Sequence, residues 1–269
     1  MAPDATRDES VVEASSTDAP SADQTFYIGW QERAPNRFVR FLRPRILGLL
    51  AGGLLLAGGL AALQSPFAPS FFEFGAPRTV EGTVVLEPHP QLLVPGPDGA
   101  LASYLLVAPL KNGAEPLVQD LDGQRVRLEG TFAFRDDQTM LEIVPETLEA
   151  IAEPTLAGGE SAGVSHGRHR LVGEIVDSKC YLGVMKPGDS KVHRACAALC
   201  LRGGIPPLFV VRRGGEPVAE LLLVGPDGEQ IGRDVLDVVA EPLAVEGELV
   251  ELADRWLLRA DPSTFERLL

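Results

Sequence analysis

The hydrophobic pattern begins with an uninterrupted apolar run near the N-terminus. From Ile46 to Leu63 every residue is apolar or glycine. At about 1.5 Å per residue the run forms a helix of about 27 Å, close to the roughly 30 Å hydrocarbon core of a bilayer. The pattern therefore predicts a single transmembrane helix at 46–63. A cleaved signal peptide and a buried helix of a soluble protein are the alternatives.

The two flanks of this run differ in charge. No Lys or Arg follows the run before Arg78, whereas five arginines lie within about 15 residues before it: Arg33, Arg37, Arg40, Arg43 and Arg45. The positive-inside rule then predicts a single-pass protein of a bacterial inner (cytoplasmic) membrane, with a cytoplasmic N-terminus and periplasmic C-terminal domains. We interpret 26–45 as a basic and aromatic juxtamembrane segment. Residues 1–25, acidic and poor in large apolar side chains, are expected to form a disordered tail.

Beyond a spacer (64–78), the pattern changes to short runs rich in β-branched and aromatic residues. Clusters of Pro, Gly and Asp separate these runs, as is typical of strands. A Gly- and Ser-containing stretch (152–169) predicts a linker between a first module (79–151) and a second (170–269). The expected strands are 79–86, 102–108, 125–134, 140–144, 169–176, 207–212, 219–224, 243–251 and 255–259.

The two modules share a weak internal repeat. The matched positions are Gly82 with Gly173, Gly130 with Gly247, and Pro145 with Pro262. The first pair has a smaller offset than the other two, so the second copy contains an extra segment, residues 178–207. The predicted fold class is mainly β: one N-terminal transmembrane helix followed by two small OB-like β-barrel modules, the second with an inserted Cys/His helix.

All three cysteines of the chain lie in this extra segment. A helix predicted at Lys191–Leu201 places His193, Cys196 and Cys200 on one face, and Cys180 precedes it. These four residues form a Cys₃His set of the kind that zinc takes, with copper, an iron–sulfur centre or haem as further options. The alternatives are a disulfide of Cys180 with Cys196 or Cys200, since an extracytoplasmic compartment is oxidising, and separate buried thiols.

The same segment resembles one found in uncharacterised bacterial membrane-anchored proteins, with the pattern D-x-x-C-Y…H-R-x-C-A-x-x-C-x-x-x-G-x-P. The residues that carry the resemblance are Asp177, Cys180, Tyr181, His193, Arg194, Cys196, Cys200, Gly204 and Pro206. It implies no particular activity. One anchor before a periplasmic OB-like barrel is also similar, in architecture alone, to the haem chaperones of cytochrome c maturation, although the His-x-x-x-Tyr attachment segment is lacking.

Charge and motif content narrow the function classes. With 24 Lys and Arg against 38 Asp and Glu, the net charge of −14 argues against nucleic acid as a partner. The chain contains no CxxCH, CxxC, phosphate-binding loop or nucleophile elbow, so we predict no catalytic residue and no small-molecule substrate. His89, His166 and His169 are expected to be solvated loop histidines.

These observations predict a non-enzymatic, extracytoplasmic accessory subunit of a membrane complex, respiratory or redox in kind. Its expected partners are the lipid bilayer and other membrane-protein subunits. The alternative is a periplasmic chaperone that handles a metal ion or haem on the Cys/His site. A thiol–disulfide enzyme is a third hypothesis, which requires an exposed cysteine of low pKa.

Overall fold

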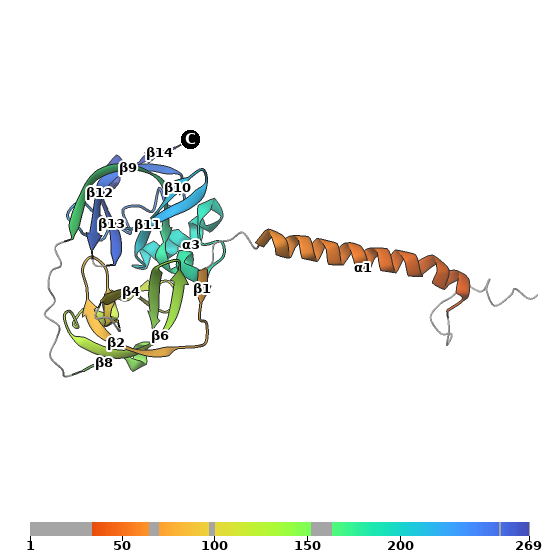
Figure 1. Cartoon of the computed structure of the whole chain (residues 1–269), viewed down its shortest axis with the longest axis horizontal. Helices are drawn as coiled ribbons and strands as arrows, with labels where there is room; N and C mark the ends of the chain where they lie inside the picture. Colours follow the sequence, from red (N-terminus) through yellow and green to blue (C-terminus); the bar gives the residue numbers. More distant parts are fainter. Residues whose placement is uncertain (1–33, 65–69, 97–99, 152–162, 253, 269) are drawn as a thin grey trace, which may run out of the picture. The chain divides into compact units, whose positions relative to one another are not determined.

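The computed structural model describes residues 34–64, 70–96, 100–151, 163–252 and 254–268. The chain divides into two compact units, Met1–Pro66 and Phe67–Leu269 (Figure 1). The predicted acidic tail (1–25) lies outside the described residues.

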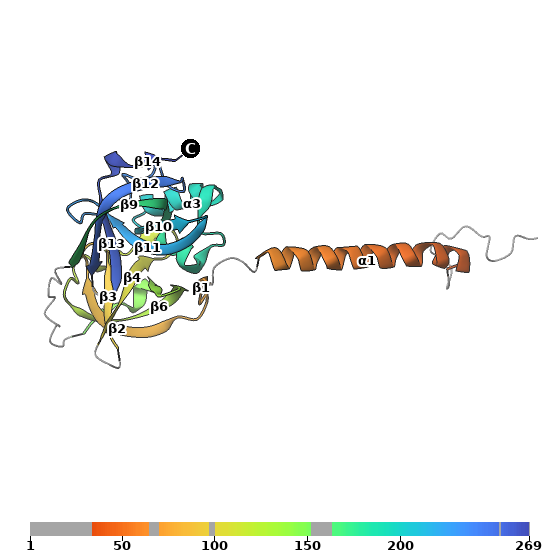
Figure 2. The ribbon, with the colours of Figure 1, turned by 45° about the horizontal axis from the view of Figure 1, so that its top comes forward.

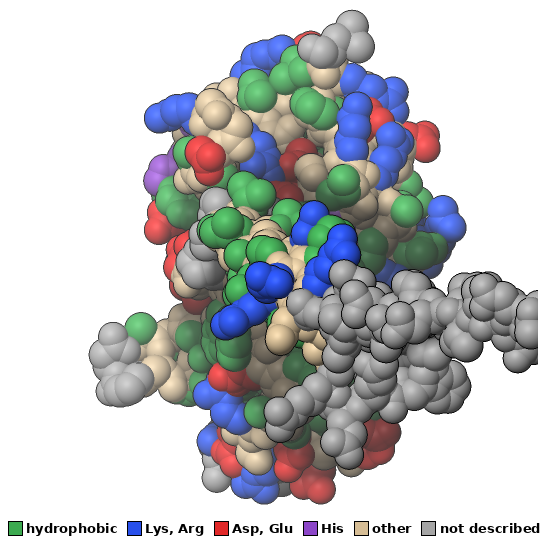
Figure 3. All heavy atoms as spheres, turned by 90° about the vertical axis from the view of Figure 1, so that its right-hand side faces the viewer, with side chains coloured by type: hydrophobic (Ala, Val, Ile, Leu, Met, Phe, Trp, Pro, Cys, Tyr) green, Lys and Arg blue, Asp and Glu red, His purple; other side chains and the backbone are tan. Residues whose placement is uncertain are grey.

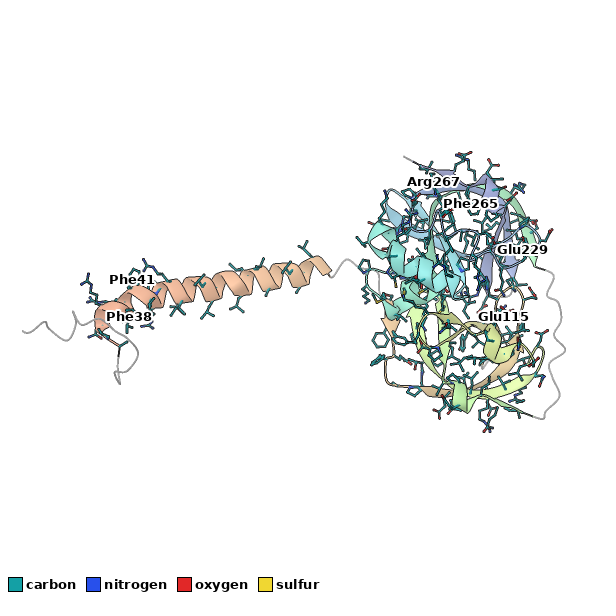
Figure 4. The ribbon with its side chains drawn as sticks, turned by 180° about the vertical axis from the view of Figure 1, so that it is seen from behind. Phe38, Phe41, Glu115, Glu229, Phe265 and Arg267 are labelled. Carbon is teal, nitrogen blue, oxygen red and sulfur yellow. The ribbon has the colours of Figure 1, made fainter. Side chains whose placement is uncertain are left out.

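The described part of the first unit is one helix, α1 (Asn36–Gln64). It contains the predicted apolar run, and it is long and apolar enough to cross a membrane. Both a membrane anchor and a signal sequence have these properties. The helix begins within the segment 26–45 and continues through Pro44. Next to this proline, the Arg45 guanidinium lies over the Phe41 ring and donates to the Phe41 carbonyl at 2.6 Å. Phe41 and Phe38 both project from this end of the helix (Figure 4).

Five strands of the first sheet form a closed ring. They pair in the order β2–β3–β4–β7–β6 and back to β2, and only the β4–β7 pair is parallel. Short strands β1 and β8 pair with β6, and β5 pairs with β4. The bounds are β1 (Ser70–Phe72), β2 (Arg78–Val85), β3 (Gln91–Pro95), β4 (Leu101–Ala108), β5 (Asn112–Gly113), α2 (Glu115–Val118), β6 (Arg125–Arg135), β7 (Gln138–Ile143), η1 (Pro145–Thr147) and β8 (Glu149–Ala150).

The second sheet repeats this order of pairings. Its strands pair as β9–β10–β11–β13–β12 and back to β9, and again only one pair in the ring, β11–β13, is parallel. A short strand, β14, pairs with β12. The bounds are β9 (Val164–Asp177), η2 (Cys180–Val184), α3 (Ser190–Arg202), β10 (Pro207–Arg213), β11 (Glu216–Val224), β12 (Leu243–Leu252), β13 (Arg255–Ala260), η3 (Pro262–Thr264) and β14 (Glu266–Arg267).

The glycines matched by the sequence repeat occupy equivalent positions in the two rings. Gly82 and Gly173 lie on the first strand of each ring, where that strand leaves one neighbour for the other. A Cβ at Gly173 would lie 2.1 Å from the Val210 carbonyl oxygen, and one at Gly82 would lie 2.6 Å from that of Leu93. Both positions therefore require glycine for a close approach of two backbones.

The two rings share part of their hydrophobic core. One buried cluster joins Leu105 and Met140 of the first ring to Val176, Leu208 and Tyr181 of the second. Two further clusters lie within the individual rings, and α3 packs against β9 in one of them (Figures 1 and 2). Charged side chains of both signs are spread over the face drawn in Figure 3. Residues 67–269 thus form one unit with two closed sheets.

Three boundaries differ from the predictions. The predicted spacer contains β1, and the predicted linker ends early because β9 already begins at Val164. Strand β3 lies where no strand was expected; it follows Pro90 and ends at Pro95. The mainly β class is as predicted, and a helix, α3, lies close to the range expected for the Cys/His helix.

Candidate metal centre

The three cysteines come from two short segments between β9 and β10. Cys180 begins η2, and its N–H donates to Asp177 Oδ1 at 2.9 Å. Cys196 and Cys200 lie one turn apart on α3, which puts both side chains on one face. Gly188 allows the segments to approach, because a Cβ there would lie 2.6 Å from the Cys180 carbonyl oxygen. The backbone therefore directs the three thiols to one place.

Their sulfur atoms all lie within 4.8 Å of one another. Cys180 Sγ is 3.8 Å from Cys196 Sγ, and all three residues are free cysteines. Cys180 and Cys200 are buried, whereas Cys196 is half-buried. Cys196 therefore gives the cluster its contact with solvent.

His193 lies beside this cluster but has a different partner. The imidazole is buried, and its Nε2 is 3.0 Å from Oδ2 of the fully buried Asp177. Asp177, His193 and Cys180 form a second group whose potential ligand atoms lie within 4.8 Å of one another. The structure thus divides the predicted Cys₃His set into two adjoining groups that share Cys180.

Lys111, from the turn between β4 and β5 of the first ring, completes the cysteine cluster. Its ammonium donates to Cys196 Sγ at 2.8 Å and to Cys200 Sγ at 3.5 Å. The hydrogen bond to Cys196 raises the pKa of Lys111 above its ordinary value. A permanent cation therefore faces two of the three thiols.

The two buried thiols differ in acidity. The hydrogen bond from Cys180 lowers the pKa of Cys200, with a further contribution from Lys111 that also opposes the effect of burial. The same hydrogen bond and burial raise the pKa of Cys180. Of the two buried thiols, Cys200 therefore ionises more readily than Cys180.

A second lysine fixes the turn that carries Lys111. Lys179 is buried, and its ammonium donates to the carbonyl oxygens of Ala108 at 2.8 Å and Leu110 at 2.7 Å. It also forms an ion pair with Glu142 of β7. Because Lys179 directly precedes Cys180, the same residue ties the cysteine segment to the first ring.

Glycines make a second joint at the end of α3. The Gly113 N–H donates to the Gly203 carbonyl at 2.9 Å. A Cβ at Gly203 would lie 1.8 Å from the Lys111 carbonyl oxygen, and one at Gly113 would lie 2.2 Å from that of Gly204. The turn 111–113 is therefore held directly against the end of the cysteine helix.

Sequence reasoning identified the cysteines but not the lysines. Lys111 lies in the module without cysteine, and nothing local connects it to residues in the other module. One signal was present: the chain has only four lysines among its 24 basic residues, and two of them are Lys111 and Lys179.

The remaining histidines have two environments. His166 and His169 are exposed, as expected, although they lie on β9. His89 is buried, with 2 % of its surface exposed, so the prediction of a solvated histidine is wrong there. Neither ring nitrogen has a hydrogen-bond partner among the residues that the structure describes, and burial lowers the pKa of His89 to about 4.

Comparison with protein-family models, curated proteins and solved structures finds no match to this chain. The geometry of the site and the apolar helix are therefore the two features from which we infer the function.

Proposed function

We propose that the chain is a membrane-anchored protein that holds one thiophilic metal ion on Cys180, Cys196 and Cys200. The observation that carries the proposal is the convergence of three sulfur atoms within 4.8 Å, on two segments fixed by backbone contacts. Thiolate groups favour Zn²⁺, Cu⁺ and iron–sulfur centres over hard ions. We place Zn²⁺ first, because it accepts thiolate and imidazole ligands in one site.

The charge of Lys111 fits this assignment. Three thiolates around a divalent ion carry one net negative charge, and the ammonium 2.8 Å from Cys196 Sγ offsets it. In a tetrahedral zinc site the fourth position falls to solvent on the Cys196 side or to His193 if it leaves Asp177. The half-buried Cys196 supports exchange of the ion, since a fully enclosed site would hold it permanently.

We further propose that both rings are OB-like barrels, with α3 inserted between the first and second strands of the second barrel. The repeated order of pairings and the equivalent glycines support this assignment. The five arginines before the apolar run support a bacterial inner-membrane location, with a cytoplasmic N-terminus and the β-rich unit in the periplasm.

An accessory subunit of a membrane complex is the second candidate. Gly48 and Gly52 have no neighbouring side chain near them on the described part of the chain, so this stripe of α1 is open to close contact with another helix. A subunit co-purifies with fixed partners in mild detergent, whereas a metal-handling protein loads its ion alone.

The decisive experiment measures metal and thiols on the same sample. The full chain is produced with its apolar helix, exported, and purified in detergent without a metal-affinity tag. We expect one metal ion per chain by elemental analysis and three free thiols in denaturant with chelator. Cys196→Ser should lose the ion, and the matched control Ala195→Ser, on the exposed neighbour in α3, should keep it.

The competing disulfide gives a different result. Protein without metal and with one free thiol would mean that Cys180 is paired with Cys196 or Cys200, and the metal proposal would be abandoned. If the ion and three free thiols are found instead, loading with Zn²⁺ and Cu⁺ in competition identifies the preferred ion.

A further inference from the structure

An exposed aromatic turn follows the apolar helix in the chain. We define the aromatic turn as Phe71–Arg78, which runs from β1 to the start of β2. Phe71 is 62 % exposed and Phe74 is 86 % exposed. No other Phe, Tyr or Trp among the described residues of the second unit is exposed. Phe71 and Phe74 lie three residues apart, and the exposure of two phenylalanines in one short segment indicates a surface that is covered in use.

The exposure is fixed by the backbone. Pairing with β6 places Phe71 opposite Phe134 and Phe72 opposite Ala133. Because side chains alternate along a strand, Phe72 packs against the shared core while Phe71 points outward. The Phe74 N–H donates to the Phe72 carbonyl at 2.8 Å, and that of Ala76 to the Glu73 carbonyl at 3.0 Å. The rings are therefore held outward in an ordered turn.

The turn forms a shallow, largely apolar surface. Its residues line a hollow of about 450 Å³. Its one carboxylate, Glu73, is paired with Arg78 at 2.7 Å, so no net negative charge remains in it. The Arg78 guanidinium also lies 4.2 Å from the centre of the Phe132 ring. In a chain of net charge −14, this neutral segment adds no electrostatic repulsion against a surface that carries anionic groups.

The length of chain after α1 identifies that surface. Phe71 is seven residues beyond Gln64, the last residue of the helix, so the two lie at most about 25 Å apart. The residues between them carry no charge. If α1 spans a bilayer, the aromatic turn cannot leave the neighbourhood of its surface. Trp and Tyr are enriched at the headgroup level, and Phe on interfacial segments is buried at the boundary between headgroups and acyl chains.

We propose that the aromatic turn docks on the bilayer that α1 spans, with Phe71 and Phe74 inserted at the headgroup level. The inference rests on the anchoring in the proposed function but not on the metal. It has a consequence for the cysteine segment, because a Cβ at Gly183 would lie 2.7 Å from the Phe71 carbonyl oxygen. The segment Cys180–Val184 therefore packs directly on the backbone of the docked strand.

The test uses the full chain in nanodiscs of phosphatidylethanolamine and phosphatidylglycerol. In a Trp30→Phe, Trp256→Phe background, Phe74→Trp supplies a single fluorophore. Val164→Trp is the matched control, because Val164 is 60 % exposed but lies on β9. We expect lipids brominated near the headgroup to quench the tryptophan at position 74 at least twofold more strongly than that at 164. Acrylamide should quench the two in the opposite order.

The outcomes separate docking from anchoring. Protein that stays with the nanodisc but shows equal quenching at both positions overturns docking and leaves the anchor intact. Protein that is absent from the nanodisc fraction overturns both, whatever metal it carries. Circular dichroism of each variant shows that the β-rich unit is folded before quenching is measured.

Discussion

At the scale of single residues, Lys111 changes the interpretation of the cysteine cluster. Three thiols alone describe a neutral, partly buried group. An ammonium that donates to Cys196 and Cys200 makes ionised sulfur more favourable at both positions. The first ring contains no cysteine, but it thus supplies the positive charge beside the cysteines of the second ring.

Replacing this lysine should weaken metal binding. Lys111→Met removes a charge-assisted hydrogen bond, which contributes about 1.5–3 kcal/mol; for this partly exposed group we take the low end, a roughly tenfold loss of affinity. Zinc affinity measured by competition with a chromophoric chelator checks this. Lys191→Met is the control, because Lys191 is an exposed lysine on α3, the helix that carries Cys196 and Cys200. If both variants bind zinc with equal affinity, Lys111 does not contribute to metal binding.

His89 makes stability depend on pH. Its pKa is lowered to about 4 by burial, against about 6.5 for an unfolded histidine. The folded state therefore binds fewer protons, and the free energy of unfolding falls as the pH decreases from about 6.5 to about 4, by about 3 kcal/mol in total. Urea unfolding at pH 7, 5 and 4 should show this loss, and His89→Leu should remove it.

A matched variant isolates this effect. His169 is exposed on β9, so His169→Leu should keep the pH dependence of the wild type. If His89→Leu and wild type lose stability in parallel, other titrating groups account for the acid sensitivity.

Residue-level prediction succeeded where the signal was local. The convergence of the three cysteines could be predicted, because their helical spacing and their common insertion are visible in the sequence. The prediction that His89 is solvated was wrong because the signal there is not local. Prolines on both sides indicate a loop, but they do not show that the loop turns into the protein. Lys111 required the packing of one ring on the other, which depends on tertiary contacts alone.

At the scale of elements, the strand pattern was more informative than the connections. Runs of β-branched residues predicted most ring strands within a few residues. Strand β3 was missed because prolines interrupt the pattern around Leu92 and Leu93. The beginning of β9 was missed because Gly167 and polar neighbours resemble a linker, although they pair with β12. Partner strands, rather than intrinsic propensity, determine both.

The end of α3 is the element most sensitive to an added methyl group. Gly203→Ala would put a Cβ 1.8 Å from the Lys111 carbonyl oxygen, so the helix end or the turn must move. We expect a loss of about 1–3 kcal/mol in unfolding free energy, together with weaker zinc binding. Thermal unfolding and chelator competition measure the two effects.

Gly232→Ala is the comparison for this variant. A Cβ at Gly232 would come no closer than 3.3 Å to a neighbour, so its cost should be smaller. A Gly203→Ala protein with native stability and affinity would show that the joint yields without consequence for the cysteines.

At the scale of the whole molecule, the shared core predicts that both rings unfold together. Leu105 and Met140 pack in one cluster with Val176 and Leu208, and Lys179 crosses to three groups of the first ring. Residues 67–269 should therefore show a single unfolding transition by circular dichroism and by tryptophan fluorescence. Two resolved transitions would show that the rings are energetically independent.

A fragment gives a second test of this coupling. Residues 163–269 alone would expose the apolar side of the shared cluster and would lack Lys111. We expect this fragment to bind a hydrophobic dye strongly and to bind zinc at least tenfold more weakly than the full chain. A fragment with full affinity and no dye binding would argue for independent modules.

The repeated order of strand pairings has a consequence for how such a molecule evolves. After a duplication, one of two equivalent copies is usually free to decay. Here one copy carries the sulfur atoms and the other carries the cation beside them, so selection on the site acts on both halves of the gene. A substitution in either half of the chain can therefore disturb the contact between Lys111 and the cysteines.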